Sequence, residues 1–145
     1  MPGITRFEDI NAWQTARELT NNVYKLTSHL GFSRDFGLRD QIRRAVVSVM
    51  SNIAEGFESR TDVQFTNYLG LARASAGEVR AQLYIALDQG YISDEKFKDT
   101  YDLAEKCARQ LARFISYLEA NPRPRRVSEE SANYDTDVSN GTFDV

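Results

Sequence analysis

The chain has 145 residues, the usual size of one domain, and its 18 basic and 21 acidic residues give a net charge of -3. The 41 % hydrophobic content allows a buried core and excludes a wholly disordered or fibrous chain. A single Cys and a single His exclude a disulfide framework and the Cys/His sets of zinc sites. No stretch approaches the ~20 apolar residues of a membrane helix and no secretory leader is recognisable, so we expect a cytoplasmic protein without membrane contact.

The first two predicted helices follow from apolar residues spaced three and four positions apart. Residues 9–29 form the first, which we expect to end before Gly31. Residues 38–58 form the second, and Gly56 weakens its last turn. The expected core residues of these helices are Ile10, Trp13, Ala16, Leu19, Val23, Leu26, Leu30, Leu38, Ile42, Ala45, Val49, Ile53 and Phe57.

Two further helices complete the predicted fold. Thr61 and Gln64 have the spacing of a capping box at the start of the third helix, which Gly90 closes, and Ser93 caps a fourth over residues 93–120. In both helices the apolar spacing is heptad-like, which is typical of helices packed about 20° from antiparallel. The expected seams are Phe65, Leu69, Ala72, Ala76, Val79, Leu83 and Ala86, then Phe97, Tyr101, Ala104, Ala108, Leu111, Ile115 and Leu118. The sequence therefore predicts an all-α fold, an antiparallel up-down four-helix bundle.

The composition changes after residue 121. Residues 122–126 alternate Pro with Arg, which predicts a stiff basic linker, and residues 127–145 contain five acids and no Lys or Arg. We therefore predict a bundle domain over residues 1–121, followed by the linker and a disordered acidic tail over residues 122–145.

The third predicted helix carries more apolar and small residues than one bundle requires. Gly70, Ala74, Gly77 and Ala81 form a small-residue stripe, although each Gly inside a helix costs ~1 kcal/mol relative to Ala. Tight packing within the bundle and a close contact between subunits both explain that stripe. A second apolar set lies off the seam and favours a homo-oligomer through that set. Its members are Leu71, Tyr84, Ile85 and Tyr91.

The sequence supplies no recognisable catalytic set. It has no Gly-rich phosphate loop, and His29 stands alone at a helix end. Cys107 lies next to the fourth seam, where we interpret it as a small core residue. No Glu-x-x-His pair of the kind that builds di-iron sites is present. We therefore expect no enzyme, no metal, no cofactor and no small-molecule substrate.

Three polar residues on the second and third helices are candidates for a buried network. Asn52, Glu55 and Glu78 would each need a hydrogen-bonding partner inside the bundle, for which Arg73 and Arg43 are available. A structural network is the first interpretation, and a binding site is the alternative.

The basic residues are mainly Arg, with 14 Arg against 4 Lys, and Arg favours bidentate contacts to phosphate or carboxylate. Arg39, Arg43, Arg44 and Arg73 are our candidates for phosphate contact. The competing interpretation is ordinary ion pairing with neighbouring acids such as Asp40. The acidic net charge favours that second interpretation, although an oligomer concentrates a modest charge into a patch.

Several motifs occur in the order found in a known family. They are Phe7-Glu8-Asp9-Ile10, Trp13-Gln14, Gln41-Ile42-Arg43-Arg44-Ala45, Ser51-Asn52-Ile53-Ala54-Glu55-Gly56, Phe65-x-x-Tyr68-Leu69 and Ala72-Arg73-Ala74-Ser75-Ala76-Gly77-Glu78. Over residues 4–120 they resemble the bacterial four-helix bundle proteins called 23S rRNA intervening-sequence proteins, and the Asn-Ile-Ala-Glu-Gly run is the most specific.

The resemblance implies an up-down bundle that assembles into a pentameric ring. A related protein is the accessory variability determinant of diversity-generating retroelements, a basic pentamer that binds reverse transcriptase and RNA. The present chain departs from that relative in its acidic balance and acidic tail. No catalytic residue carries over. We expect a non-enzymatic pentameric scaffold that engages RNA or a nucleoprotein, the alternative being a protein-interaction or structural oligomer with no nucleic-acid role.

Overall fold

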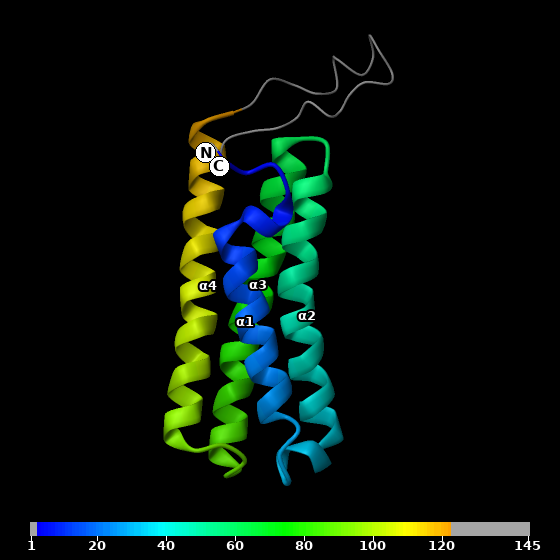
Figure 1. Cartoon of the computed structure of the whole chain (residues 1–145), viewed down its shortest axis with the longest axis vertical. Coiled ribbons are helices and arrows are strands. Elements are labelled where there is room, and N and C mark those ends of the chain that lie inside the picture. The colour runs from blue at the N-terminus through cyan, green and yellow to red at the C-terminus, as the bar shows by residue number, and fades with distance from the viewer. Residues whose placement is uncertain (1–2, 123–145) are drawn as a thin grey trace.

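The computed structural model describes residues 3–122 and consists of four long helices and two single 3-10 turns (Figure 1). The helices are α1 (Asn11–Leu26), α2 (Phe36–Glu58), α3 (Asp62–Asp88) and α4 (Asp94–Ala120), and the turns are η1 (Phe7–Asp9) and η2 (Phe32–Arg34). No strand occurs within this part of the chain. The prediction of an all-α, four-helix fold is confirmed, whereas the tail and nearly all of the linker fall outside the described residues.

The helix boundaries follow from local capping chemistry. The Thr61–Gln64 capping box is present in full, and the Ser93 hydroxyl accepts from the Lys96 N–H at 3.1 Å. The start of α2 differs from the prediction by two residues, because the Asp35 carboxylate caps it by accepting from the Leu38 N–H at 3.1 Å. Helix α1 is shorter than predicted, and Gly31 at φ 96° reverses the chain after it.

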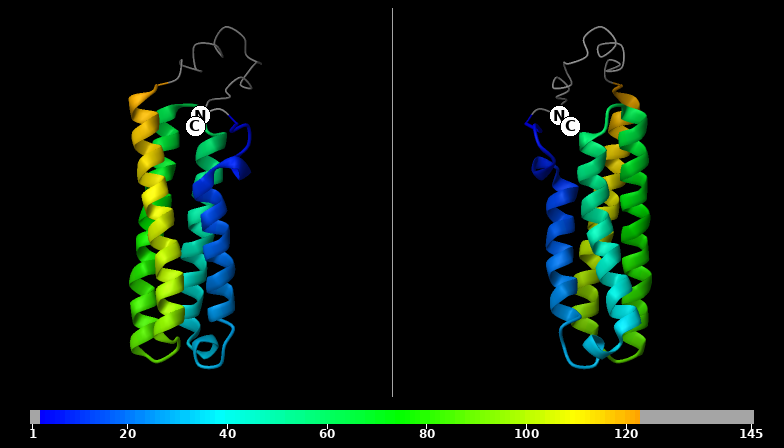
Figure 2. Two further views of the ribbon diagram at one scale, coloured as in Figure 1. Left: turned by 60° about the vertical axis from the view of Figure 1, so that its left-hand side comes forward. Right: turned by 90° about the vertical axis from the view of Figure 1, so that its right-hand side faces the viewer.

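Each helix packs against two neighbours around the bundle: α1 and α3 both contact α2 and α4. The α1–α2 and α3–α4 connections lie at one end of the bundle, and the α2–α3 connection lies at the other (Figure 2). The first of these ends carries the candidate site described below.

The core forms two apolar clusters, one towards each end of the bundle. One contains Ile10, Phe65 and Phe114, with the Phe65 and Phe114 rings 5.2 Å apart and edge to face. The other surrounds Phe32 and Leu83. All seven predicted seam residues of α3 are fully buried, so that prediction is confirmed.

The seam of α4 is shifted by one position from the predicted one. Thr100, Cys107 and Phe114 are buried, whereas Phe97, Tyr101 and Ile115 are only half-buried. Both stripes share the same small and aliphatic residues, and spacing does not distinguish them. The prediction that Leu30 belongs to the core is also wrong, because Leu30 lies beyond the end of α1 and is 73 % exposed.

Gly56 marks the closest approach of α2 and α3. A Cβ at this position would lie 2.8 Å from Phe65 Cδ1 and 2.9 Å from Tyr68 Cβ. Only a residue without a side chain therefore fits here. Gly56, which the sequence marks only as a weak point of the last helical turn, is required by packing.

Candidate nucleic-acid interface and oligomer face

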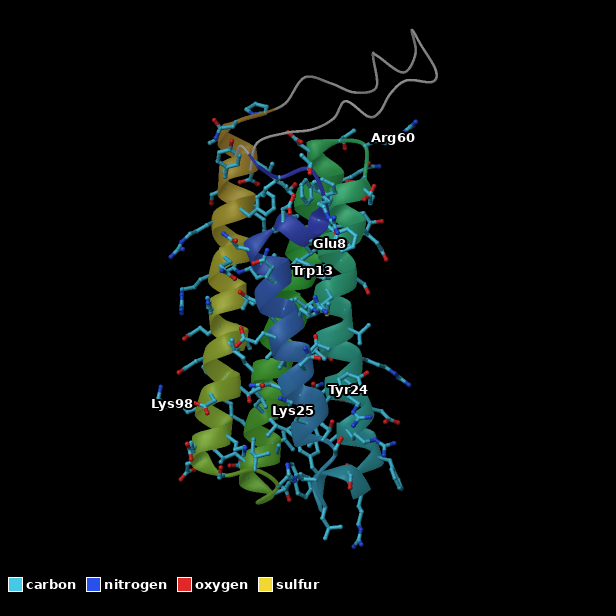
Figure 3. All side chains as sticks on the ribbon, viewed as in Figure 1. Glu8, Trp13, Tyr24, Lys25, Arg60 and Lys98 are labelled. Carbon is cyan, nitrogen blue, oxygen red and sulfur yellow. The ribbon has the colours of Figure 1, made fainter. Side chains whose placement is uncertain are left out.

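Positive charge gathers where α1 ends and α2 begins. We call this region the basic corner and define it by the five cations Lys25, Arg34, Arg39, Arg43 and Arg44. Its acids are Asp35, which caps α2, and Asp40. Figure 3 shows Tyr24 and Lys25 near the end of α1, with Tyr24 on the side that faces α2. The corner thus has an excess of cations although the chain as a whole is acidic.

The Arg43 side chain makes several contacts inside the corner. Its Nε donates to Thr27 Oγ1 at 2.7 Å, and its guanidinium carbon lies 4.4 Å from the centre of the Tyr24 ring. A weaker contact joins its Nη2 to Ser28 Oγ at 3.5 Å. Arg43 therefore fastens the end of α1 to α2, and the charge that remains is spread over an aromatic ring.

Arg39 is anchored in a similar way. Its Nη1 donates to the Ser33 carbonyl at 3.1 Å, its Nε to Asp40 Oδ1 at 3.0 Å, and its guanidinium carbon lies 4.8 Å from the Phe36 ring centre. The ion pair with Asp40 bears out the competing interpretation for this residue. Phe36 itself is 63 % exposed, which leaves one aromatic face of the corner open to solvent.

Three cations of the corner are free among the described residues. Arg44, Arg34 and Lys25 are exposed and form no ion pair or side-chain hydrogen bond within residues 3–122. Arg44 lines a shallow groove of about 430 Å³ together with Tyr24, Asp40, Arg43, Val47 and Ser48. These cations are available to a ligand without breaking an internal contact. Sequence reasoning missed Lys25 and Arg34 because they lie outside the regular Arg spacing of α2.

Arg73 does not join the corner. It lies seven residues before Arg80 on the same side of α3, and Arg80 reaches the Tyr101 ring of α4 with its guanidinium carbon 6.0 Å from the ring centre. Arg73 is exposed on that α4-facing side. The structure thus brings Arg39, Arg43 and Arg44 together and leaves Arg73 apart.

The predicted buried network is wrong for its two carboxylates. Glu55 and Glu78 are exposed, because the face of each helix on which they lie points away from the core. Asn52 is half-buried, and its amide donates to the Ser48 carbonyl and hydroxyl, both at 2.9 Å. Ser48 Oγ in turn lies 2.9 Å from Ser75 Oγ on α3. This Ser48–Ser75 contact between α2 and α3 is neutral and includes neither Arg43 nor Arg73. In a second contact, the buried Gln82 amide donates to Gln41 Oε1 of α2 and to Glu78 Oε2, both at 3.3 Å.

The side of α3 that points away from the core carries several exposed apolar residues together with the exposed polar residues Asn67 and Glu78. We call its apolar part the outer face of α3 and define it by the exposed or half-exposed apolar residues and glycines. These are Val63, Gly70, Leu71, Ala74, Gly77, Ala81, Tyr84 and Ile85. Its large members are between 47 % and 70 % exposed.

Packing within the bundle does not explain the glycines of this face. A Cβ at Gly70 would have no atom within 4 Å, and one at Gly77 would meet only Arg80 Nη2 at 3.6 Å. The interpretation of the small-residue stripe as tight packing within one chain is therefore wrong for Gly70. The other interpretation of the stripe, a close contact between subunits, stays a prediction.

Tyr91 packs within its own chain, so its assignment to the predicted oligomer interface is wrong. Its hydroxyl donates to Asp35 Oδ2 at 2.9 Å, and its ring stacks on Phe32 at 5.4 Å. The bond to the carboxylate raises the pKa of Tyr91, and partial burial adds to the effect. Leu71, Tyr84 and Ile85 are exposed in the single chain, and their part in an interface stays a prediction. The Tyr84 ring also packs on Phe97 and Tyr101 of α4, with ring centres 4.9 and 5.8 Å away.

Cys107 and His29 show no arrangement for catalysis. Cys107 is fully buried with Sγ 3.5 Å from the Ala12 carbonyl, and burial raises the pKa of its thiol to about 12. His29 is exposed at the end of α1. Within residues 3–122 no group of three or more His, Cys, Asp or Glu is placed to hold a metal ion. None of the helices in that range has the length and apolar content needed to cross a bilayer.

Comparison with known proteins gives a family and a fold. No curated protein matches the chain. A solved structure from Bacteroides thetaiotaomicron, titled a protein with unknown function from the S23 ribosomal protein family, has a TM-score of 0.68 and 20 % identity. The alignment covers 72 % of this chain and 95 % of that one, and at this identity it shows the fold alone. The profile of a family described as 23S rRNA-intervening sequence protein matches residues 8–113, so the chain belongs to the family of 23S rRNA-intervening sequence proteins.

Proposed function

We propose that the protein is a non-enzymatic, cytoplasmic homo-oligomer, a pentamer, that binds RNA or an RNA–protein complex through the basic corner. The observation that carries the proposal is the group of three unpaired cations beside exposed aromatic rings. Arg and Lys neutralise phosphates, and aromatic or guanidinium planes stack on unpaired bases. The family name refers to 23S rRNA, which makes structured RNA the ligand to test first.

Self-association supplies the charge density that one chain lacks. The outer face of α3 offers exposed apolar side chains and two glycines that allow a second backbone to approach. A ring closed through this face repeats the basic corner once in every subunit, and the ring of five is the size that the family resemblance implies. Multivalent contact then raises the affinity for one RNA above that of a single corner.

The test compares two double variants that lose the same charge. Arg34→Gln with Arg44→Gln removes free cations of the corner, whereas Arg17→Gln with Arg109→Gln removes exposed cations elsewhere, at positions that contact Trp13 and Glu105. Fluorescence anisotropy with a structured RNA should show weaker binding for the first pair only. Its salt slope should also fall by about one for each lost phosphate contact. Equal weakening by both pairs would mean that binding follows net charge and would reject the corner.

One observation favours the alternative, a protein-interaction or structural oligomer without nucleic acid. The α3–α4 connection lies at the same end of the bundle as the basic corner and is flanked by Asp88, Asp94 and Glu95 (Figure 1). These carboxylates lower the positive potential of that end. If neither double variant changes partner capture and nuclease treatment has no effect, the alternative is supported.

A further inference from the structure

A pocket of about 500 Å³ lies at the opposite end of the bundle from the basic corner, between the N-terminal segment, the start of α1 and the last turns of α4. Its lining residues include Ile4, Asp9, Ile10, Gln110, Arg113 and Phe114. The volume is within the range of pockets that take small organic ligands. We propose that this pocket binds a free α-amino acid with a large apolar side chain.

The charges of the pocket match a zwitterion. Arg113 comes from α4 and Asp9 from η1, and both line the pocket without forming an ion pair with any residue in 3–122. Asp9 Oδ2 accepts from the Thr5 N–H at 3.1 Å, which leaves the other carboxylate oxygen available. A ligand carboxylate has a partner in the Arg113 guanidinium, and a ligand ammonium has one in Asp9.

Neutral polar groups with free bonding capacity lie beside these charges. The Gln110 side chain lines the pocket and makes no hydrogen bond within the described residues, and its Oε1 is buried without a partner, which costs free energy in the folded chain. Helix α1 has Ile10 as its N-cap, and no side chain caps it. Its first N–H groups, at Asn11 and Ala12, therefore add donors for a carboxylate on the same wall.

The rest of the wall is apolar. Ile10 is 2 % exposed and Phe114 is 7 % exposed, and both belong to the core cluster that contains Phe65, so the packing of the bundle holds this wall in place. Ile4 of the N-terminal segment and Tyr117 of α4 complete it. An aromatic or branched aliphatic side chain buries apolar surface here, whereas a small polar amino acid does not.

The pocket is separate from the surfaces used in the proposed function. It is built from the N-terminal segment, η1, α1 and α4. Self-association uses the side of α3 that points away from the core, and the basic corner is at the far end. Amino-acid binding is therefore measurable in the full-length assembly, and its success or failure is independent of RNA binding.

The experiment is an amide-resolved NMR titration of the full chain with L-phenylalanine. We expect saturable shifts at Asn11, Ala12 and the Gln110 side-chain amide below about 10 mM ligand. Arg113→Gln should weaken binding about tenfold or more, because it removes the partner of the carboxylate. The matched variant Arg109→Gln, one turn earlier on α4 and outside the pocket, should leave the affinity unchanged.

Two analogues test the zwitterion separately. 3-Phenylpropionate lacks the ammonium group and phenethylamine lacks the carboxylate, so each should bind about tenfold more weakly than L-phenylalanine. No saturable shift up to about 10 mM, or binding that is indifferent to Arg113→Gln, would overturn the site. Equal affinity for 3-phenylpropionate and L-phenylalanine would overturn the proposal that the pocket recognises both charges of a zwitterion.

Discussion

Gly56 shows how one residue decides the approach of two helices. Its position leaves less than 3 Å between a built Cβ and both Phe65 and Tyr68, and the Tyr68 atom is a Cβ fixed to the α3 backbone. Gly56→Ala should therefore lower the free energy of unfolding by ~1–3 kcal/mol, despite the better helix propensity of Ala. Urea denaturation measures the loss. Gly37→Ala is the control, because its Cβ meets only Asp35 Oδ1 at 4.0 Å, and a stable Gly56→Ala would contradict the close contact.

The thiol of Cys107 should be inert in the folded protein. Burial raises its pKa to about 12, so the reactive thiolate is scarce at about pH 8 and the sulfur is inaccessible as well. An aromatic disulfide reagent should label it only when the chain unfolds. The same reagent in denaturant controls for a thiol that is already oxidised. Rapid labelling under native conditions would show that the α1–α4 contact at Ala12 opens readily.

Tyr91 makes stability depend on alkaline pH. Its folded pKa is raised because its hydroxyl donates to the Asp35 carboxylate, so folding favours the neutral phenol. The resulting stabilisation is fully present below the unfolded pKa of about 10 and is lost as the pH rises through the folded pKa. The stability difference between wild type and Tyr91→Phe should be constant near neutral pH and shrink in alkali. If the stability difference does not change with pH, the hydrogen bond from Tyr91 to Asp35 does not stabilise the fold.

At the scale of the element, the outer face of α3 carries the prediction of self-association. Leu71→Glu places a charge on this face at a position that is 56 % exposed, so the bundle itself should remain folded. The variant should dissociate into smaller species in analytical ultracentrifugation, because a charge buried between subunits has no partner. Leu30→Glu is the control: Leu30 is 73 % exposed but lies at the end of α1. If both variants keep the wild-type mass, the outer face of α3 is not the interface.

Helix number and most helix boundaries follow from sequence because capping and periodicity are local. The α3 seam is predictable for the same reason, since the capping box sets its start and one stripe dominates. The α4 seam is not, because two adjacent stripes share Ala104, Leu111 and Leu118 and only packing selects between them. The prediction that Glu55 and Glu78 are buried is wrong. Spacing places each of them near the edge of the buried stripe, but it does not show on which side of that edge the residue is exposed to solvent.

The candidate site is predicted only in part for a related reason. The spacing of Arg39, Arg43 and Arg44 indicates one side of α2 correctly. Their bonding, however, depends on how the segment between α1 and α2 folds back, which supplies Thr27 and Ser33 as acceptors. That tertiary contact turns two of the predicted phosphate ligands into anchors for the end of α1.

At the scale of the whole molecule, charge and apolar surface are separated in space. The basic corner lies at the end of α1, the outer face runs along α3, and the pocket proposed to bind an amino acid lies at the other end between the N-terminal segment, α1 and α4. The proposed self-association through one side would therefore leave the cations exposed on another. A net charge of -3 for the chain is therefore compatible with a local site for RNA.

The measurement that tests the central claim most directly is the salt dependence of RNA binding by the full-length protein of known mass. Three free cations per subunit at one corner predict that affinity for a structured RNA falls roughly 20- to 40-fold between about 50 and 200 mM salt. Larger losses are expected if several subunits bind the same RNA. Affinity that is unchanged between these salt concentrations, or no binding at either, would contradict the claim that the basic corner contacts phosphate.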